Sequence, residues 1–180
     1  DYLGRLEDRI DNLEANMAII GLGYIGLPTA VAFHNAGFNV LGVDASPNVI
    51  NSLKNGRSPI TEEVGMEIPQ GTRWEVTSEF ESSIEKCDLI IVCVPTPVDK
   101  NLHPDISAIE SALDSIIASI NYDNKTVIIL ESTVQPGTTR NCIKLSSEKH
   151  LESNERILMA YCPERVSPGE GGYGVEDVPR

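Results

Sequence analysis

A short apolar run that breaks into a glycine-rich turn constrains the fold of this chain more than any other feature. Met17–Ile20 leads directly into Gly21-x-Gly23-x-x-Gly26. In such a turn the first glycine permits a tight exit from a strand, the second lets the backbone approach a pyrophosphate, and the third lets the next helix pack closely on the strand. The first N–H groups of that helix then face the phosphates. The turn therefore predicts a dinucleotide site.

Short apolar runs alternate with helix-like segments along the rest of the chain. Strands are expected at Ala18–Ile20, Asn39–Val43, Trp74–Val76, Leu89–Val94, Thr126–Leu130 and Ile157–Tyr161. Helices are expected at Tyr24–Asn35, Pro47–Asn55, Ser78–Lys86, Ile106–Ile120 and Thr138–Lys149. Strands rich in Ile and Val that alternate with helices are typical of a parallel sheet covered on both faces. We predict an α/β fold with a doubly wound, mostly parallel, six-stranded Rossmann sheet in the order 3-2-1-4-5-6, whose crevice lies between the first and fourth strands.

Composition excludes several classes of function. The formal net charge of −13 argues against a nucleic-acid-binding surface. No apolar run approaches the roughly 20 residues of a membrane span, so no membrane partner is expected. The four cysteines lack CxxC spacing, which favours reduced thiols in a cytoplasmic protein. The three histidines are isolated, and no metal site is predicted.

Two stretches lie outside the alternating pattern. Residues 1–15 place four apolar side chains at helical spacing, which predicts an extra amphipathic helix before a dinucleotide-binding domain over residues 16–180. This helix either lies on the surface of its own domain or mediates self-association. The loop Ser58–Arg73 is interrupted by Pro and Gly and is a candidate cover for part of the crevice.

Asp44 ends the second predicted strand, 23 positions after Gly21. A carboxylate at this spacing accepts hydrogen bonds from the ribose hydroxyls of the adenosine and repels a 2′-phosphate. No Arg follows in Ala45-Ser46-Pro47, so NAD is favoured over NADP. The alternative role is an N-cap for the helix that opens at Pro47, and the two roles are compatible.

Two further motifs follow strands that end at the same edge. Val92-Cys93-Val94-Pro95-Thr96-Pro97 turns the chain sharply out of the sheet, which brings the Thr96 hydroxyl towards the dinucleotide; a purely structural turn is the alternative. In Glu131-Ser132-Thr133-Val134-Gln135-Pro136-Gly137, Ser132 and Thr133 either position the cofactor or a water, or cap the next helix.

The sixth predicted strand runs into Tyr161-Cys162-Pro163-Glu164-Arg165-Val166-Ser167-Pro168-Gly169. An acid beside a base at the ligand edge, held between prolines, is able to supply a general base and an anion clamp. An ordinary surface loop with Glu164 and Arg165 is the competing interpretation.

Together these four motifs resemble the amino-terminal half of the UDP-glucose/GDP-mannose dehydrogenase family. They occur in the family's order and span Gly21 to Gly169. The YCPERV form is most similar to the branch that acts on UDP-N-acetylhexosamines, particularly the UDP-N-acetyl-D-mannosamine dehydrogenases.

The resemblance implies oxidation of a UDP-sugar C6 alcohol to a carboxylate with two NAD, for polysaccharide biosynthesis. In this family an enzyme cysteine captures the aldehyde, and water hydrolyses the resulting thioester. By the same resemblance, Glu164 assists hydrolysis, Thr133 helps to hold the water, and Arg165 and Val166 contact the sugar nucleotide. The positions that match family contacts to NAD are Tyr24, Ile25, Asp44, Thr96 and Thr133.

The chain also departs from the family pattern. Val49 stands near a position that is often basic in the family, and none of the four cysteines lies in the nucleophile's motif. The resemblance places the nucleophilic cysteine, the catalytic lysine and a helical dimerisation region outside this chain. We therefore expect the chain to be inactive alone and the full-length enzyme to be a homodimer. UDP-glucose and other UDP-N-acetylhexosamines remain alternative substrates. A non-catalytic NAD-binding module, and a hydroxyacid or sugar-phosphate dehydrogenase, are the alternative functions.

Overall fold

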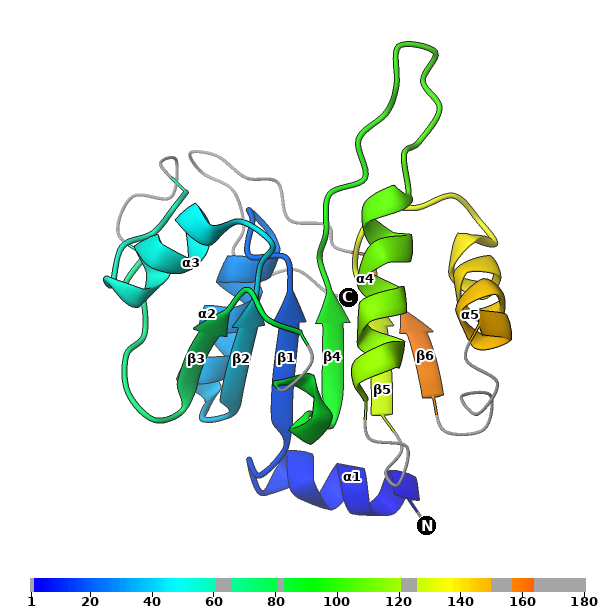
Figure 1. The fold of residues 1–180 in the computed structure, drawn as a ribbon. Helices are drawn as coiled ribbons and strands as arrows, with labels where there is room; N and C mark the ends of the chain where they lie inside the picture. Colours follow the sequence, from blue (N-terminus) through cyan, green and yellow to red (C-terminus); the bar gives the residue numbers. More distant parts are fainter. Residues whose placement is uncertain (1, 61–65, 81–82, 121–125, 150–156, 164–180) are drawn as a thin grey trace.

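The protein folds around a six-stranded sheet in which all neighbouring strands are parallel (Figure 1). The structure is a computed structural model that describes residues 2–60, 66–80, 83–120, 126–149 and 157–163. The strand order is β3-β2-β1-β4-β5-β6, which confirms the predicted doubly wound topology. The strands are β1 (Asn16–Ile20), β2 (Asn39–Val43), β3 (Trp74–Thr77), β4 (Leu89–Val92), β5 (Thr126–Leu130) and β6 (Ile157–Tyr161).

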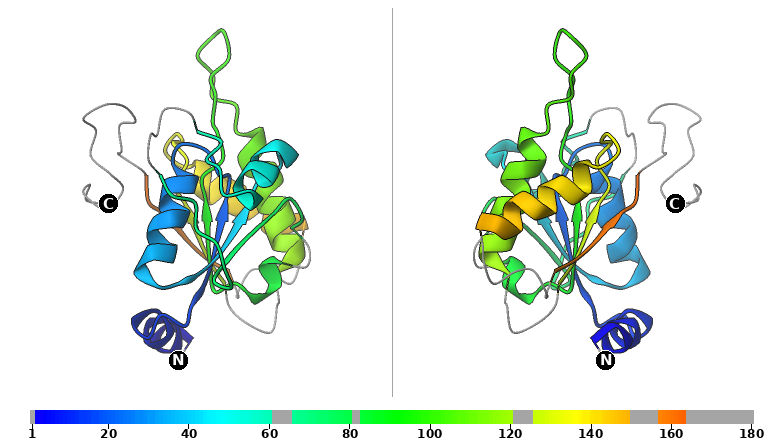
Figure 2. Two further views of the ribbon diagram at one scale, coloured as in Figure 1. Left: turned by 90° about the vertical axis from the view of Figure 1, so that its left-hand side faces the viewer. Right: turned by 90° about the vertical axis from the view of Figure 1, so that its right-hand side faces the viewer.

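Helices cover both faces of this sheet, with α2 on one face and α4 on the other (Figure 2). Alternate residues of β1 divide between two buried clusters, Met17 and Ile19 in one and Ala18 and Ile20 in the other, because successive side chains of a strand point to opposite faces. The helices are α1 (Tyr2–Asp11), α2 (Gly26–Ala36), α3 (Pro47–Lys54), α4 (Ser107–Ser119) and α5 (Thr138–Lys149).

The structure corrects two of the predicted elements. The helix expected over Ser78–Lys86 is wrong: residues 78–80 are not helical, and one 3-10 turn, η1 (Ile84–Lys86), follows. The Thr77 hydroxyl oxygen accepts the Glu79 N–H over 3.0 Å, a local bond that competes with a helix start, and the single 3-10 turn is enough to bury Ile84 fully. The fourth strand ends at Val92 and not at Val94, since the prolines that follow divert the chain from the sheet.

Beyond β4 the chain forms a narrow hairpin that projects from the carboxyl edge of the sheet before α4 begins (Figure 2). Val98 and Pro104 pair in an antiparallel bridge, and Asp105 N–H donates to the Pro97 carbonyl over 2.7 Å.

The loop Ser58–Arg73 was expected to cover part of the crevice, but its described residues pack elsewhere. Its residues Ile60 and Ile68 are buried in the cluster on the α2 face, and none of its described residues lines the cavity described below.

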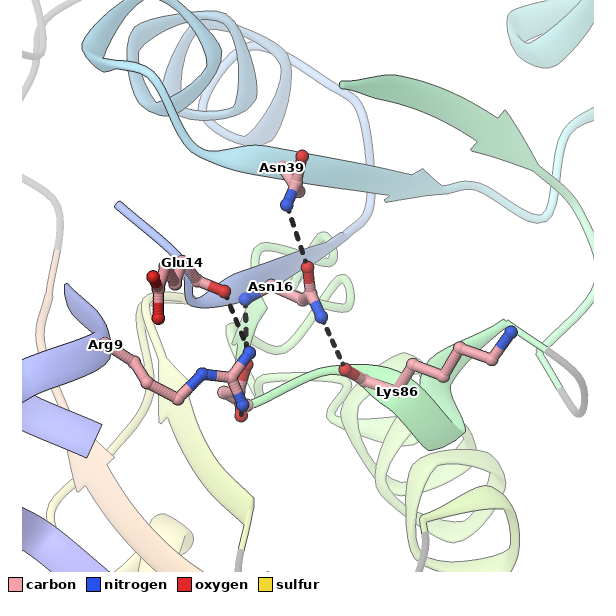
Figure 3. Close-up of polar contacts among 6 residues, drawn as sticks. Arg9, Glu14, Asn16, Asn39 and Lys86 are labelled. Carbon is pink, nitrogen blue, oxygen red and sulfur yellow. Dashed lines mark hydrogen bonds and ion pairs between the residues drawn. The ribbon is translucent and has the colours of Figure 1, made fainter. Parts of the chain in front are cut away.

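The amino-terminal helix α1 lies beneath the opposite, amino edge of the sheet (Figure 1). Leu6 is buried in the hydrophobic cluster on the α2 face of the sheet. Arg9 donates from Nη1 to Asp88 Oδ1 over 2.7 Å and from Nη2 to the Glu14 carbonyl over 2.8 Å (Figure 3). The second oxygen of Asp88 accepts the Asn16 N–H over 2.8 Å. Helix α1 therefore packs on the surface of its own domain.

Asn16 extends this network to β2 and to the 3-10 turn η1. Its side-chain Nδ2 donates to the Lys86 carbonyl over 3.0 Å, and its Oδ1 accepts from Asn39 Nδ2 over 3.1 Å (Figure 3). The start of β1 is thereby fastened to β2 and to the segment that enters β4.

Candidate functional site

A cavity of about 870 Å³ opens at the carboxyl edge of the sheet, where the strand order reverses between β1 and β4. This is the position at which doubly wound sheets bind their ligands. One side of α4 completes the wall. The lining residues are Ile20, Gly21, Gly23, Tyr24, Ile25, Val43, Asp44, Ala45, Ser46, Phe80, Cys93, Val94, Pro95, Thr96, Ala108, Ser111, Ala112, Ser115, Glu131, Ser132 and Thr133.

The glycine turn has the geometry that a close approach by phosphate requires. Gly21 has a φ of +89°, which favours glycine, and a Cβ there would lie 2.9 Å from the Cys93 carbonyl oxygen. A Cβ on Gly26 would overlap the Gly21 carbonyl and stand 3.1 Å from Cys93 Cβ. A Cβ on Gly23 would meet nothing within 4 Å, so this position faces open space in the cavity wall.

Helix α2 stands directly behind this loop, and the Leu27 and Thr29 N–H groups of its first turn donate to the Gly23 and Ile25 carbonyls. Helix α2 begins at Gly26, and its N-terminus carries the positive end of the helix dipole. The small residue at Gly26 lets that N-terminus approach the end of β1. The three glycines thus hold the chain in a shape that leaves room for an anion at the helix start, and a pyrophosphate fits this cradle.

Asp44 follows β2 directly and fixes the glycine turn. Its Oδ2 accepts the Leu22 N–H over 2.8 Å, and its Oδ1 accepts the Ser46 N–H over 2.8 Å. Each carboxylate oxygen has a second lone pair with which to accept a ribose hydroxyl. Helix α3 begins at Pro47 with Ser46 as its N-cap residue, so Asp44 orders the turn before the helix without being its N-cap.

The loops after β4 and β5 are fastened to each other. The Thr96 hydroxyl donates to the Thr133 carbonyl over 2.9 Å, and the Ser132 hydroxyl donates to the Val94 carbonyl over 2.7 Å. The Ser132 hydroxyl therefore bonds the backbone of the loop after β4 and not the start of α5. These contacts hold Thr96 and Thr133 on the cavity wall, where Tyr24 and Ile25 also lie.

Two lining groups were missed by sequence reasoning. The buried Glu131 carboxylate accepts the Cys93 thiol hydrogen, with Sγ and Oε2 3.4 Å apart. Glu131 directly follows an apolar strand at the ligand edge, and that position was the available signal. The other missed group is a row of small residues on the side of α4 that lines the cavity. They recur at helical spacing and are Ala108, Ser111, Ala112 and Ser115.

The cysteines of the chain are all free thiols. Burial, followed by the charges of Asp88 and Glu75, raises the pKa of Cys87 from 9.0 to about 12. Burial also raises the pKa of Cys142. Neither thiol is therefore suited to be a nucleophile near neutral pH. Within the ranges that the structure describes, no three His, Cys, Asp or Glu side chains form a metal-binding group, and no helix is both long and apolar enough to cross a membrane.

Residues 15–180 match the sequence profile of the UDP-glucose/GDP-mannose dehydrogenase family, NAD binding domain. The chain belongs to this family. The predicted resemblance is confirmed, and NAD is the cofactor of the domain.

Named members of this dehydrogenase family differ in substrate. A UDP-N-acetyl-D-mannosamine dehydrogenase of Methanococcus vannielii is 37% identical over 158 residues, which cover 86% of this chain and 35% of the relative. A UDP-N-acetyl-D-glucosamine 6-dehydrogenase of Salmonella typhi is 33% identical over 167 residues, or 92% of this chain and 38% of the relative. The structure of a UDP-D-ManNAc dehydrogenase from Pyrococcus horikoshii superposes with a TM-score of 0.73 at 31% identity, over 86% of this chain and 37% of that one. The chain thus spans little more than a third of the length of these dehydrogenases.

Three of the predicted site residues of this family member lie outside the described part of the chain. These are Glu164, Arg165 and Val166, which follow the last described residue, Pro163. The other predicted site residues, Gly21, Gly23, Tyr24, Ile25, Asp44, Thr96, Ser132 and Thr133, all line the one cavity, whereas Gly26 stands behind the turn.

Proposed function

We propose that this chain is the NAD-binding portion of an enzyme that oxidises C6 of UDP-N-acetyl-D-mannosamine to the uronate with two NAD. The observation that carries the proposal is the cavity at the strand-order reversal, with an open glycine cradle and Asp44 at one end. The substrate rests on similarity to relatives named for that sugar nucleotide. A UDP-N-acetyl-D-glucosamine 6-dehydrogenase is almost as similar, so that sugar is the alternative substrate.

Each group around the cavity has a defined task in binding the cofactor. Asp44 accepts hydrogen bonds from the ribose hydroxyls of the adenosine and repels a 2′-phosphate, which selects NAD over NADP. The backbone around Gly23 and the start of α2 receive the pyrophosphate. Thr96, Ser132 and Thr133 then form the wall on the β4 and β5 side, where the nicotinamide half is expected. When bound, NAD⁺ supplies the acceptor for the hydride that leaves C6.

The chemistry after hydride transfer is assigned by motif. Glu164, with Thr133, holds and activates the water that hydrolyses a thioester, while Arg165 and Val166 bind the sugar nucleotide. The support for these roles is the order of motifs from Gly21 to Gly169. The relatives are nearly three times as long as the matched segment. We therefore propose that central and carboxyl-terminal domains supply the nucleophilic thiol and the dimer interface. The free thiols are consistent with a cytoplasmic enzyme.

A substrate panel tests the proposal directly. The full-length enzyme that contains this sequence is incubated with NAD⁺ and, separately, with UDP-N-acetyl-D-mannosamine, UDP-N-acetyl-D-glucosamine, UDP-glucose and GDP-mannose. We expect the highest kcat/KM with UDP-N-acetyl-D-mannosamine and two NADH formed per sugar. A higher kcat/KM for another sugar would replace the substrate, and one NADH per sugar would contradict the four-electron oxidation.

The 180-residue chain provides the matched comparison. It should bind NAD⁺ but produce no sustained NADH with any of these sugars. Turnover by this chain alone would show that it carries its own nucleophile.

A further inference from the structure

The loops that follow β4 and β5 border one side of the cavity and are joined to each other by side chains. The backbone ladder between these strands reaches the Val92 carbonyl, which accepts the Glu131 N–H over 3.0 Å. It cannot continue regularly along the β4 side, because Pro95 and Pro97 carry no N–H. From this point side-chain hydroxyls connect the two loops.

Two hydroxyl bonds run between the loops in opposite directions. The Ser132 hydroxyl donates to the Val94 carbonyl over 2.7 Å, with a longer contact of 3.5 Å to the Val92 carbonyl. The Thr96 hydroxyl donates to the Thr133 carbonyl over 2.9 Å. A hydroxyl has a single hydrogen to donate, so both donors are committed to the protein itself. These two bonds, Thr96–Thr133 and Ser132–Val94, form a loop lock.

The two bonds of the loop lock support each other. A single hydrogen bond contributes modestly to stability, because water competes for the same donor and acceptor. Ser132 is only 8% exposed, so water has little access to its bond. While either bond is closed, it holds the partners of the other within reach, as in any pair of linked contacts. Loss of one bond should therefore loosen the loops slightly, and loss of both should let them separate.

We propose that Thr96 and Ser132 are positioning residues, whose loop lock holds the wall for the nicotinamide half of NAD in place before the cofactor binds. Asp44 follows β2 and marks the adenosine half, so a dinucleotide across the crevice places its nicotinamide half over β4 and β5. The lock fixes the backbone of Thr133 in this wall. A wall that is already ordered spares the cofactor the entropy cost of ordering it. The place of the nicotinamide half rests on the proposed function.

Hydrogen exchange in the chain without cofactor tests the loop lock directly. The Glu131 N–H donates to the Val92 carbonyl at the last rung before the lock, so its exchange rate, measured by NMR, reports separation of the loops. Thr96→Val replaces a hydroxyl by a methyl of similar size, and Ser132→Ala removes the second hydroxyl. We expect the Glu131 amide to exchange about threefold faster in each single variant and about thirtyfold faster in the double variant.

A second amide serves as an internal control for this measurement. The Gly21 N–H donates to the Val43 carbonyl over 2.8 Å, at the ends of β1 and β2. It lies away from the loop lock and should keep its exchange rate in all three variants. An unchanged rate there shows that the rest of the sheet is intact.

Cofactor binding provides the second readout. Titration calorimetry gives the Kd for NAD⁺ and for ADP, which carries the adenosine and the pyrophosphate but no nicotinamide half. We expect the Kd for NAD⁺ to rise about threefold in each single variant and about thirtyfold in the double variant, because neither bond then covers for the other. Independent contacts would give only about ninefold in the double variant. The Kd for ADP should stay within about twofold in every variant.

The conservative variant Thr96→Ser keeps the hydroxyl. It should return the Glu131 exchange rate and the Kd for NAD⁺ to within about twofold of the unmodified chain. An unchanged Glu131 exchange rate in the double variant would overturn the positioning role, because the hydroxyls would then act by touching the cofactor. Equal weakening of NAD⁺ and ADP would overturn it as well, because the loss would then extend to the whole site.

Failure of the unmodified chain to bind either ligand would contradict the NAD site of the proposed function and, with it, the role of this wall. The exchange of the Glu131 amide distinguishes that result from failure of the loop lock, since it is measured without any cofactor.

Discussion

Asp44 holds the glycine turn by accepting the backbone N–H of Leu22 at 2.8 Å, the residue between the first two glycines. One side chain therefore connects the end of β2 to the loop after β1 and lies on the wall of the cavity. The residue that recognises the ribose also shapes the backbone that receives the phosphates. A change at Asp44 consequently affects both ends of the adenosine diphosphate half.

Replacing Asp44 tests this double role. Asp44→Asn removes the negative charge and leaves one acceptor for two backbone donors. We expect the Kd for NAD⁺ to rise by about tenfold to a hundredfold, which corresponds to the loss of one or two charge-assisted hydrogen bonds. Discrimination against NADP⁺ should fall, since the repulsion of its 2′-phosphate is lost. Calorimetric titration with both cofactors measures this. Asp105→Asn is the control, because Asp105 lies outside the cavity lining and should leave both Kd values unchanged.

The glycines of the turn should separate folding from binding. Gly21→Ala places a Cβ 2.9 Å from a carbonyl at a φ of +89°, and we expect it to destabilise the fold by about 1–3 kcal/mol. Gly23→Ala adds a Cβ to open space and should leave the melting temperature unchanged while it weakens NAD⁺ binding at least tenfold. Thermal melting and titration of the same samples give both quantities. Gly4→Ala, also in open space but in α1, is the control that should leave the Kd for NAD⁺ unchanged, and alanine's higher helix propensity there should not lower the melting temperature. Normal NAD⁺ affinity in Gly23→Ala would mean that phosphate does not approach this position.

Helix α1 should contribute to stability and not to cofactor binding. Arg9→Ala removes the two hydrogen bonds to Asp88 and to the Glu14 carbonyl, so the free energy of unfolding should fall by about 1–2 kcal/mol. Leu6→Ala should lower it by about 2 kcal/mol or more through loss of buried surface. Arg5→Ala is a matched exposed control, expected near zero. Urea unfolding and NAD⁺ titration test this, and a changed Kd in Arg9→Ala would contradict the separation of the two edges.

Cys87 should make stability fall in alkaline solution. Its pKa is raised from 9.0 to about 12 in the folded state, so its contribution is complete below pH 9 and is lost as pH rises towards 12. Between pH 7 and pH 10, we expect the chain to lose about 1.4 kcal/mol more stability than Cys87→Ala, the equivalent of one pKa unit. The cavity left by alanine is the same at both values and cancels. Urea unfolding at the two pH values measures the difference, and parallel losses would show that the Cys87 thiol does not resist ionisation.

Most of the sheet could be predicted because its strands are buried on both faces. A strand covered by helices on both sides is apolar throughout, and Thr126–Leu130 therefore has the same bounds in sequence and structure. The segment Ser78–Lys86 could not be predicted in this way, because its form depends on how much chain is needed to cross from β3 to β4 while burying Ile84.

Some residues of the candidate site could be predicted from the sequence, and others could not. Glycine spacing and Asp44 are local signals, and each was predicted from its neighbours in the chain. The Cys93–Glu131 pair joins residues 38 positions apart, and only the register of β4 with β5 brings them together. The destination of the Ser132 hydroxyl was equally hidden, since its acceptor is the Val94 carbonyl in the neighbouring loop.

The sequence by itself determined the doubly wound fold, the dinucleotide turn, the preference for NAD and the family, because each depends on residues close together or on an ordered set of short motifs. The tertiary structure decided where α1 packs, how the loops after β4 and β5 are fastened, and which charges line the cavity. These depend on contacts between distant segments. Burial at such contacts changes the behaviour of a thiol or a carboxylate, and burial is a property of the folded chain alone.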